Sequence, residues 1–518
     1  MVKKKVEIKF KDIQWFLPTI YLSSAFILLI SFEKTIDYYY GDTLSLSLKS
    51  FLSHDINILA NTFGGLGEIA PAIIAIALTV IAIVVELVAN KYSPKIVDLF
   101  IEDRKNNFII SFFVISALNQ LFVANTLTEK SYFSLLVALI MIMTTIILII
   151  PYFNYVFTFL HPTQFIKLVK ERSIKTFDSI NNNNYNDKKE EIHYFIDFIG
   201  DIAINSTEQS DRSTALECIN SLNEIITKYY SYKNKLPIHW FILTDIEYKD
   251  PDFTDFSPFV LQNIEKDKIW LERKVFKLFE LLFINSHNKQ RDISSGILAN
   301  LQFYAKSCIE VRYDAGISLS MKMLNTLLRI SINTHSPRSA FNILEHYRVI
   351  GEYMILKYSK NILELAKYIK YYAQESNKLG VYFIMETAAH DLFVLNKLAY
   401  EKNIPYINKL LDIFLSLDEP VENEAERAEY GLIGVRIAQT KLATFYLYNN
   451  RPDLADLIYK DMKSEPLERI EKIKLIILSN QEEEYYEFTG RGINFFFIED
   501  EYKPFLMEFF TWFEFNYD

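Results

Sequence analysis

Long apolar segments are confined to the first 160 residues, whereas the rest of the chain alternates apolar and charged residues with helical spacing. A transmembrane helix needs about 20 consecutive, mostly apolar residues, and the N-terminal part offers four such segments. We therefore predict a transmembrane domain over residues 1–160. Its four membrane-spanning helices are expected at residues 13–32, 66–90, 108–125 and 132–160.

The second apolar segment carries its small and polar residues in a regular pattern. They recur at alternating spacings of four and three, which places them on one side of a helix. This set, called the small-polar stripe below, comprises Glu68, Ala72, Ala75, Thr79, Ala82, Glu86 and Ala89. Its two glutamates are separated by roughly 27 Å along a helix axis, which is about the thickness of the hydrocarbon core.

Two interpretations of the small-polar stripe remain open. Small residues let transmembrane helices pack closely against one another. Alternatively, the stripe lines a pore in a symmetric oligomer, with a ring of carboxylates at each mouth. The third segment contains Asn119 and Gln120, whose amides can join neighbouring helices or line an ion path.

The distribution of lysine and arginine predicts the topology. Cations cluster in residues 1–11, 91–105 and 167–175, whereas residues 33–65 contain only Lys34 and Lys49. Because cytoplasmic loops are enriched in cations, we expect a multi-pass protein of the cell inner (plasma) membrane with both termini in the cytoplasm. Residues 33–65 are then outside, where Leu48, Phe51, Leu52, Ile56 and Leu59 predict a short amphipathic helix on the membrane surface.

After residue 160 the pattern predicts an all-α cytoplasmic region. We expect a membrane-proximal helical subdomain at 161–257, a helical-repeat-like domain at 258–481 and an acidic, aromatic-rich tail at 482–518. Residues 441–462 resemble a tetratricopeptide-type helical hairpin, although no steady 34-residue period is present. An α-solenoid is the expected architecture, and a compact helical bundle is the alternative. The tail should pack on this region or on a neighbouring subunit, because so many aromatic side chains are unfavourable in water.

Three short motifs resemble a widespread family of prokaryotic integral membrane proteins known as a domain of unknown function. The first is Trp-Phe-x-Pro at residues 15–18, and the second is Ser-Pro-Lys at 93–95, followed by Asp-Arg at 103–104. The third is a degenerate signature, Ser206–Ala215. The resemblance spans roughly residues 12–230. It implies a multi-pass membrane topology and assigns no chemistry.

Composition argues against several functional classes. The net charge is −10 without a basic stripe, so we expect no nucleic-acid partner. The two cysteines, Cys218 and Cys308, do not suggest a disulfide framework. Phosphate-loop, zinc-protease, Cys-x-x-Cys and serine-hydrolase motifs are absent, and the eight histidines lack metal-ligand spacing. We therefore expect no enzyme activity, no cofactor and no metal site.

Two hypotheses for function follow. In the first, the chain forms a homo-oligomeric, cation-conducting channel, whose second span lines the pore and whose cytoplasmic helices serve assembly or gating. In the second, it is a non-conducting, membrane-anchored scaffold or sensor whose helical domain binds a protein partner. Both hypotheses place the protein in contact with membrane lipid.

Overall fold

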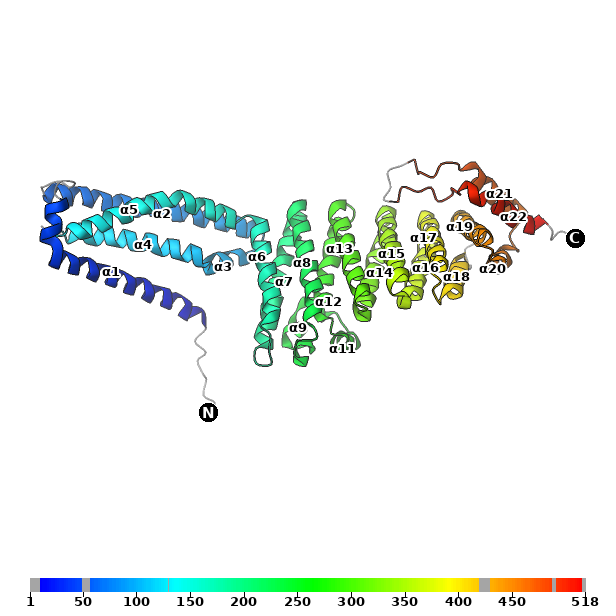
Figure 1. The fold of residues 1–518 in the computed structure, drawn as a ribbon, viewed down its shortest axis with the longest axis horizontal. Coiled ribbons are helices and arrows are strands. Elements are labelled where there is room, and N and C mark those ends of the chain that lie inside the picture. Colours follow the sequence, from blue (N-terminus) through cyan, green and yellow to red (C-terminus); the bar gives the residue numbers. More distant parts are fainter. Residues whose placement is uncertain (1–9, 49–55, 129, 419–428, 487–490, 515–518) are drawn as a thin grey trace. The chain divides into compact units, whose positions relative to one another are not determined.

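The computed structural model describes residues 10–48, 56–128, 130–418, 429–486 and 491–514 (Figure 1). The chain divides into two compact units, residues 1–167 and 168–518. Apart from turns and one isolated β-bridge between Glu484 and Ile493, the described secondary structure is helical. The all-α prediction is therefore confirmed.

The first unit contains four long helices and one short helix. They are α1 (Phe10–Leu48), α2 (Ile56–Lys91), α3 (Lys95–Glu102), α4 (Arg104–Asn125) and α5 (Tyr132–Phe159). By length and composition, four stretches can cross a membrane: Thr19–Thr43, Ile74–Lys91, Arg104–Asn125 and Tyr132–Phe159. The four predicted spans are thus present as helices.

The first helix is longer than the sequence suggested. Residues 33–48 continue α1 without a break, and Ile56 already belongs to α2, so the expected separate surface helix is absent from the described residues. Phe51 and Leu52 lie outside them. Gly41 in this continuation allows a close approach of two backbones, because a Cβ built there would lie 2.7 Å from the backbone oxygen of Lys130. The helix therefore passes very close to the α4–α5 turn.

Asp37 of α1 also fixes the start of α5. The backbone N–H of Phe133 donates to Oδ1 of Asp37 at 2.9 Å, and the hydroxyl of Ser134 donates to Oδ2 of the same carboxylate. A carboxylate that accepts from the first turn of a helix satisfies backbone donors left without intrahelical partners and interacts favourably with the helix dipole. Helix α1 thus supplies the cap that α5 lacks in its own sequence.

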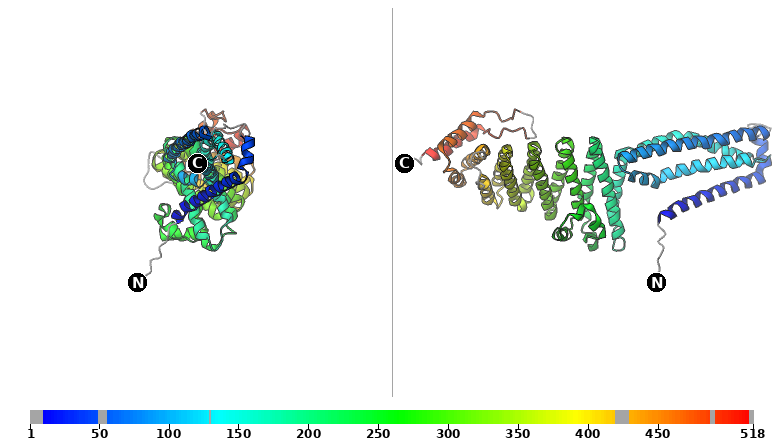
Figure 2. Two further views of the ribbon diagram at one scale, coloured as in Figure 1. Left: turned by 90° about the vertical axis from the view of Figure 1, so that its left-hand side faces the viewer. Right: turned by 180° about the vertical axis from the view of Figure 1, so that it is seen from behind.

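The second unit is an α-solenoid built from pairs of helices joined by short connections (Figures 1 and 2). One layer contains α8, α13, α15, α17 and α19, each packed on the next, and the other contains α7, α12, α14, α16 and α18. The bounds are α7 Tyr185–Glu208, α8 Arg212–Tyr232, α12 Trp270–Ser286, α13 Arg291–Glu310, α14 Asp314–Asn333, α15 Pro337–Lys357, α16 Ile362–Lys378, α17 Tyr382–Glu401, α18 Ile407–Leu415 and α19 Glu429–Tyr448.

The repeat is longer than that of a tetratricopeptide. Successive pairs begin at Trp270, Asp314, Ile362 and Ile407, so their spacings are 44, 48 and 45 residues. Such lengths are closer to the 40–47 residues of other two-helix repeats. These repeats therefore have no 34-residue period.

Two further segments complete the second unit. Between α8 and α12 lies an insertion with η1 (Ile238–Phe241), α9 (Asp245–Lys249), α10 (Pro251–Thr254) and α11 (Pro258–Asp267). After α19 come α20 (Pro452–Met462), α21 (Leu467–Ser479), η4 (Asp500–Tyr502) and α22 (Lys503–Glu514). Residues 441–462 form the hairpin of α19 and α20, in which Ala443, Tyr446 and Ala455 are buried.

The described part of the tail packs on the solenoid. The guanidinium of Arg491 binds both carboxylate oxygens of Asp391 in α17 and lies 4.7 Å from the ring of Phe341 in α15. The ring of Phe495 stacks on His390 with centroids 4.2 Å apart. Helix α22 packs on α19 and α21.

Candidate functional site

Helix α2 presents three different faces. One face is buried in the first unit, where α2 packs on α4, and contains Ile74, Ala77, Ile81 and Val85. The small-polar stripe is offset from this face by roughly a third of a turn, at about 100° per residue. The third face is exposed and apolar, with Ile76, Val80, Ile83 and Leu87.

The small-polar stripe is largely exposed within one chain. Ala72, Ala75, Thr79, Ala82 and Glu86 are exposed, whereas Ala89 is buried. Glu68 belongs to α2, but its side chain is outside the described part of the structure. The packing of the first unit therefore uses the Ile and Val face of α2 and leaves most of the stripe available.

The two polar groups of the described stripe differ in their partners. The hydroxyl of Thr79 donates to the backbone oxygen of Ala75 at 2.8 Å, within its own helix. For Glu86 the described residues provide neither a hydrogen bond nor an ion pair. A carboxylate on a membrane-facing helix is costly unless water, a partner or the interface receives it.

The predicted amides Asn119 and Gln120 are both buried and point to different helices. The Nδ2 group of Asn119 donates to Oε1 of Glu33 in α1 at 3.0 Å, whereas Nε2 of Gln120 donates to the backbone oxygen of Ala138 in α5. The two amides thus link α4 to α1 and to α5. Three buried oxygens here have no hydrogen-bond partner among the described residues: Glu33 Oε2, Asn119 Oδ1 and Gln120 Oε1.

Glu33 was missed by the sequence analysis because it follows directly after an apolar run, where a span is expected to end. It is 1% exposed. The signal was its spacing from Asp37, since two acids four residues apart lie on one face of a helix. Both face α4 and α5.

At the N-terminal end of α4, polar contacts join α3, α4 and α5. Asp103 caps α4 by accepting from the backbone N–H of Asn106 at 2.8 Å, and it also accepts from the hydroxyl of Tyr155. The hydroxyl of Tyr152 donates to Oδ1 of Asn106 at 2.6 Å. The Asp-Arg motif at 103–104 therefore contains a helix cap.

A groove of about 370 Å³ runs between α4 and α5 beside these contacts. Its lining consists of residues of both helices: Arg104, Lys105, Phe108 and Ile109 of α4, and Leu148, Pro151, Tyr152 and Tyr155 of α5. Its exposed lining is almost entirely apolar, because Arg104 and Lys105 contribute mainly the carbon atoms of their side chains to it.

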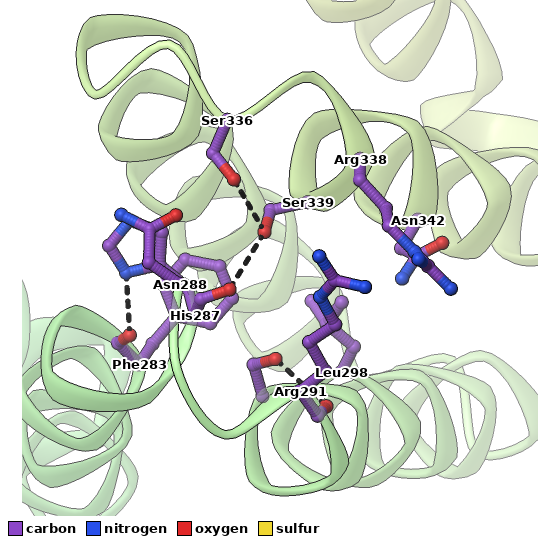
Figure 3. Close-up of a pocket in the computed structure, with 10 residues that line it drawn as sticks. Phe283, His287, Asn288, Arg291, Leu298, Ser336, Arg338, Ser339 and Asn342 are labelled. Atoms are coloured by element: carbon purple, nitrogen blue, oxygen red, sulfur yellow. Dashed lines mark hydrogen bonds between the residues drawn. The ribbon is translucent and has the colours of Figure 1, made fainter.

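The second unit contains a smaller pocket, of about 40 Å³, between the α12–α13 and α14–α15 turns (Figure 3). His287, Ser336 and Ser339 line it, and Ser339 donates to the backbone oxygen of His287 at 3.3 Å. Arg291 and Arg338 also line it, at the starts of α13 and α15. The described residues form no ion pair with either arginine.

A buried charge network attaches the insertion to α7 and α12. The ring of His193 lies with Nε2 3.0 Å from Glu247 and Nδ1 3.1 Å from Asp250. Lys189 is 2.9 Å from Glu247. The ring of His193 stacks on Trp270 with centroids 4.9 Å apart.

One cluster in this network has the donor set of a cation site. Oxygens of Asp197, Asp250 and Asp252 lie within 4.8 Å of one another. However, Nζ of Lys274 lies 2.7, 2.6 and 2.9 Å from these three carboxylates. The ammonium group therefore occupies the position that a metal ion would take, and the cluster is an ion-pair network.

Four candidate spans followed by a solenoid define an integral membrane protein with a large helical-repeat domain. Consistent with this, residues 11–197 match the family model described as "Predicted membrane protein (DUF2254)". The resemblance inferred from the motifs is thereby confirmed over most of its length, although the signature at 206–215 lies beyond the matched residues. No curated protein matches the chain.

Among solved structures, the chain is similar to a "Circular tandem repeat protein with novel repeat topology and enhanced subunit contact surfaces". The sequence identity is 12%, the TM-score is 0.34, and the match covers 82% of this chain and 98% of the other. At this level of similarity the match has no bearing on function.

Proposed function

We propose that the protein is a homo-oligomeric membrane channel for cations, in which the small-polar stripe of α2 lines the pore. One observation carries the proposal: the stripe is exposed within the chain, and Glu86 on it has no described partner. Small side chains leave space around an axis, and a ring of carboxylates concentrates cations and repels anions. The third, exposed apolar face of α2, with Ile76, Val80, Ile83 and Leu87, is suited to lipid or to neighbouring subunits.

The test compares adjacent positions on α2. We expect Ala75→Trp to block cation flux into proteoliposomes while the oligomer still forms. Ile76→Trp is the matched control, because Ile76 is 67% exposed and lies on the apolar face, so flux should persist. If the stripe is instead a close helix contact, Ala75→Trp overfills it and disrupts assembly. Loss of assembly in Ala75→Trp, together with the absence of flux through the wild-type protein, would contradict the channel.

The charge of Glu86 gives a second readout. We expect Glu86→Gln to lower the preference for cations over anions by roughly tenfold at low ionic strength. Asp98→Asn, at an exposed position of α3, removes the same charge outside the stripe and should leave selectivity unchanged. Equal effects of the two variants would indicate a general surface-charge effect rather than a pore.

A second candidate function is a non-conducting scaffold or sensor. The observation in its favour is the pocket of Figure 3, where Arg291 and Arg338 converge without described carboxylate partners. Such a pair suits a carboxylate of an acidic peptide. Binding of a poly-glutamate peptide that is lost in Arg291→Gln/Arg338→Gln, in a protein that assembles but carries no current, would favour this candidate.

A further inference from the structure

We propose that the groove between α4 and α5 binds one anionic phospholipid, with its phosphate at Arg104 and Lys105 and an acyl chain along Phe108, Ile109, Leu148 and Pro151. The proposal is independent of conduction. It rests on the shape of the groove, the position of its cations and the chemistry of its lining.

The groove itself is apolar, and two exposed cations, Arg104 and Lys105, lie next to it at the start of α4. Arg104 and Lys105 are the first two residues of a stretch that can cross the membrane, Arg104–Asn125, so they lie near a membrane–water boundary. Phe108 and Ile109 follow about one turn further, roughly 6 Å deeper. A volume of about 370 Å³ accommodates part of an acyl chain against this apolar lining.

The charged ends of Arg104 and Lys105 are exposed beside the groove mouth. The nearest carboxylate in sequence, Asp103, accepts from the backbone of Asn106 and from Tyr155. Neither Arg104 nor Lys105 forms a described ion pair. The mouth also lies at the N-terminal end of the 22-residue helix α4, where the helix dipole favours an anion. This complementarity selects an anionic headgroup over a zwitterionic one.

The groove is also held open by contacts that do not depend on a ligand. Tyr152 and Tyr155 form part of its lining, and their hydroxyls donate to Asn106 and Asp103. These bonds fix the spacing of α4 and α5 at the mouth. Basic pockets between transmembrane helices are known sites for anionic lipid headgroups.

Native mass spectrometry of the full-length protein in nonionic detergent tests the proposal. We expect phosphatidylglycerol to remain bound under conditions that remove phosphatidylcholine with the same acyl chains. Arg104→Gln/Lys105→Gln should weaken phosphatidylglycerol binding by about 30-fold. Lys167→Gln/Lys175→Gln removes two cations outside the groove and should leave binding unchanged.

Two further experiments test the apolar part of the groove and separate binding of a lipid from binding of its free headgroup. Leu148→Trp keeps both cations but fills the apolar part of the groove, so it should also reduce binding. Glycerol 3-phosphate, a water-soluble headgroup, should neither bind at comparable concentration nor compete. Equal binding of the two lipids, binding of glycerol 3-phosphate as strong as that of the lipid, or unchanged binding in both groove variants would overturn the proposal.

Discussion

Single residues with left-handed backbone conformation end many helices of the solenoid. Their φ angles are positive at Ser210, Arg312, His335, Asn403, Asn450 and Gly380. At each turn, the N–H of the following residue donates to the carbonyl five residues before it, as from Ser336 to Ser331 at 2.8 Å. This is the Schellman motif, in which glycine is preferred because other residues are strained by their Cβ.

His335 is the position where this strain can be removed most simply. It is exposed, with φ of 50°. We predict that His335→Gly raises the free energy of unfolding of the second unit by about 1 kcal/mol. Fluorescence of the buried Trp240 and Trp270 reports the transition. Asn333→Gly, at the last residue of α14, should instead destabilise the second unit by about 1 kcal/mol. A loss of stability in both variants would show that the left-handed conformation of His335 is not strained.

The His193 network combines groups whose pKa values move in opposite directions. Burial lowers the pKa of His193, but hydrogen bonds to Asp250 and Glu247 outweigh it, so the pKa is raised. Burial raises the pKa of Glu247, yet the hydrogen bond from His193 and the charge of Lys189 lower it to about 2. The ammonium of Lys274 also faces this site and opposes protonation of His193.

These shifts predict a stability maximum in mildly acidic solution. The stability that Glu247 contributes is present above its unfolded pKa of about 4.5 and is lost as the pH falls towards 2. The stability that His193 contributes is present below its unfolded pKa of about 6.5 and is lost as the pH rises through its raised pKa in the folded protein. We predict that His193→Gln flattens the alkaline decline in Tm, whereas His161→Gln, at an exposed position, keeps the wild-type profile. An unchanged slope in His193→Gln would argue against a charged imidazolium.

At the scale of elements, Arg491 fastens the C-terminal segment to α15 and α17. Its guanidinium is 2% exposed and meets Asp391, which is fully buried. Removing Arg491 leaves buried Asp391 with the more distant Arg348, whose Nε lies 3.7 Å away, and breaking a buried ion pair is strongly destabilising. The Nε of Arg491 also lies 3.0 Å from a carboxylate oxygen of Glu345 in α15. The segment is therefore expected to depend strongly on this one arginine.

We predict that Arg491→Met destabilises the second unit by about 3–5 kcal/mol and makes residues near 491 accessible to protease. Lys503→Met is the matched control, because Lys503 pairs with an Asp500 that is 93% exposed, and surface pairs contribute only about 0–1 kcal/mol. The double variant Arg491→Met/Asp391→Leu should recover much of the loss. Failure to recover would mean that Arg491 acts mainly through its other contacts, Glu345, Phe341 and Phe495.

Sequence patterns predicted those elements whose spacing is local. Apolar runs located the four spans, and helical spacing predicted an all-α second unit. The length of α1 was not predictable in this way, because Glu33 and Asp37 end an apolar run and find their partners only in α4 and α5. The α4–α5 groove was missed for the same reason: Arg104 and Leu148 lie far apart in sequence. The exposure of the small-polar stripe could be seen only in the structure, since the sequence does not show which face of α2 packs on α4.

At the scale of the whole molecule, the two units meet different solvents. Exposed side chains of the first unit include a run of three aromatic residues at 38–40, near the end of the stretch Thr19–Thr43. Tyrosine is enriched at membrane–water interfaces, so we expect this run to lie at one boundary of the membrane. We expect the cations at Lys91, Lys95, Arg104 and Lys105 to lie at the other.

This placement predicts the sidedness of the chain, and two engineered cysteines test it. Thr43 and Asn182 are both exposed, and the native Cys218 and Cys308 are buried, with pKa values raised by burial, to about 12 for Cys308. A membrane-impermeant maleimide should therefore label only an introduced thiol. Because cytoplasmic loops carry the cations, Thr43→Cys should react in intact cells and Asn182→Cys only after permeabilisation. The reverse pattern would place the solenoid outside and invert the topology, while labelling of both in intact cells would be incompatible with four spans.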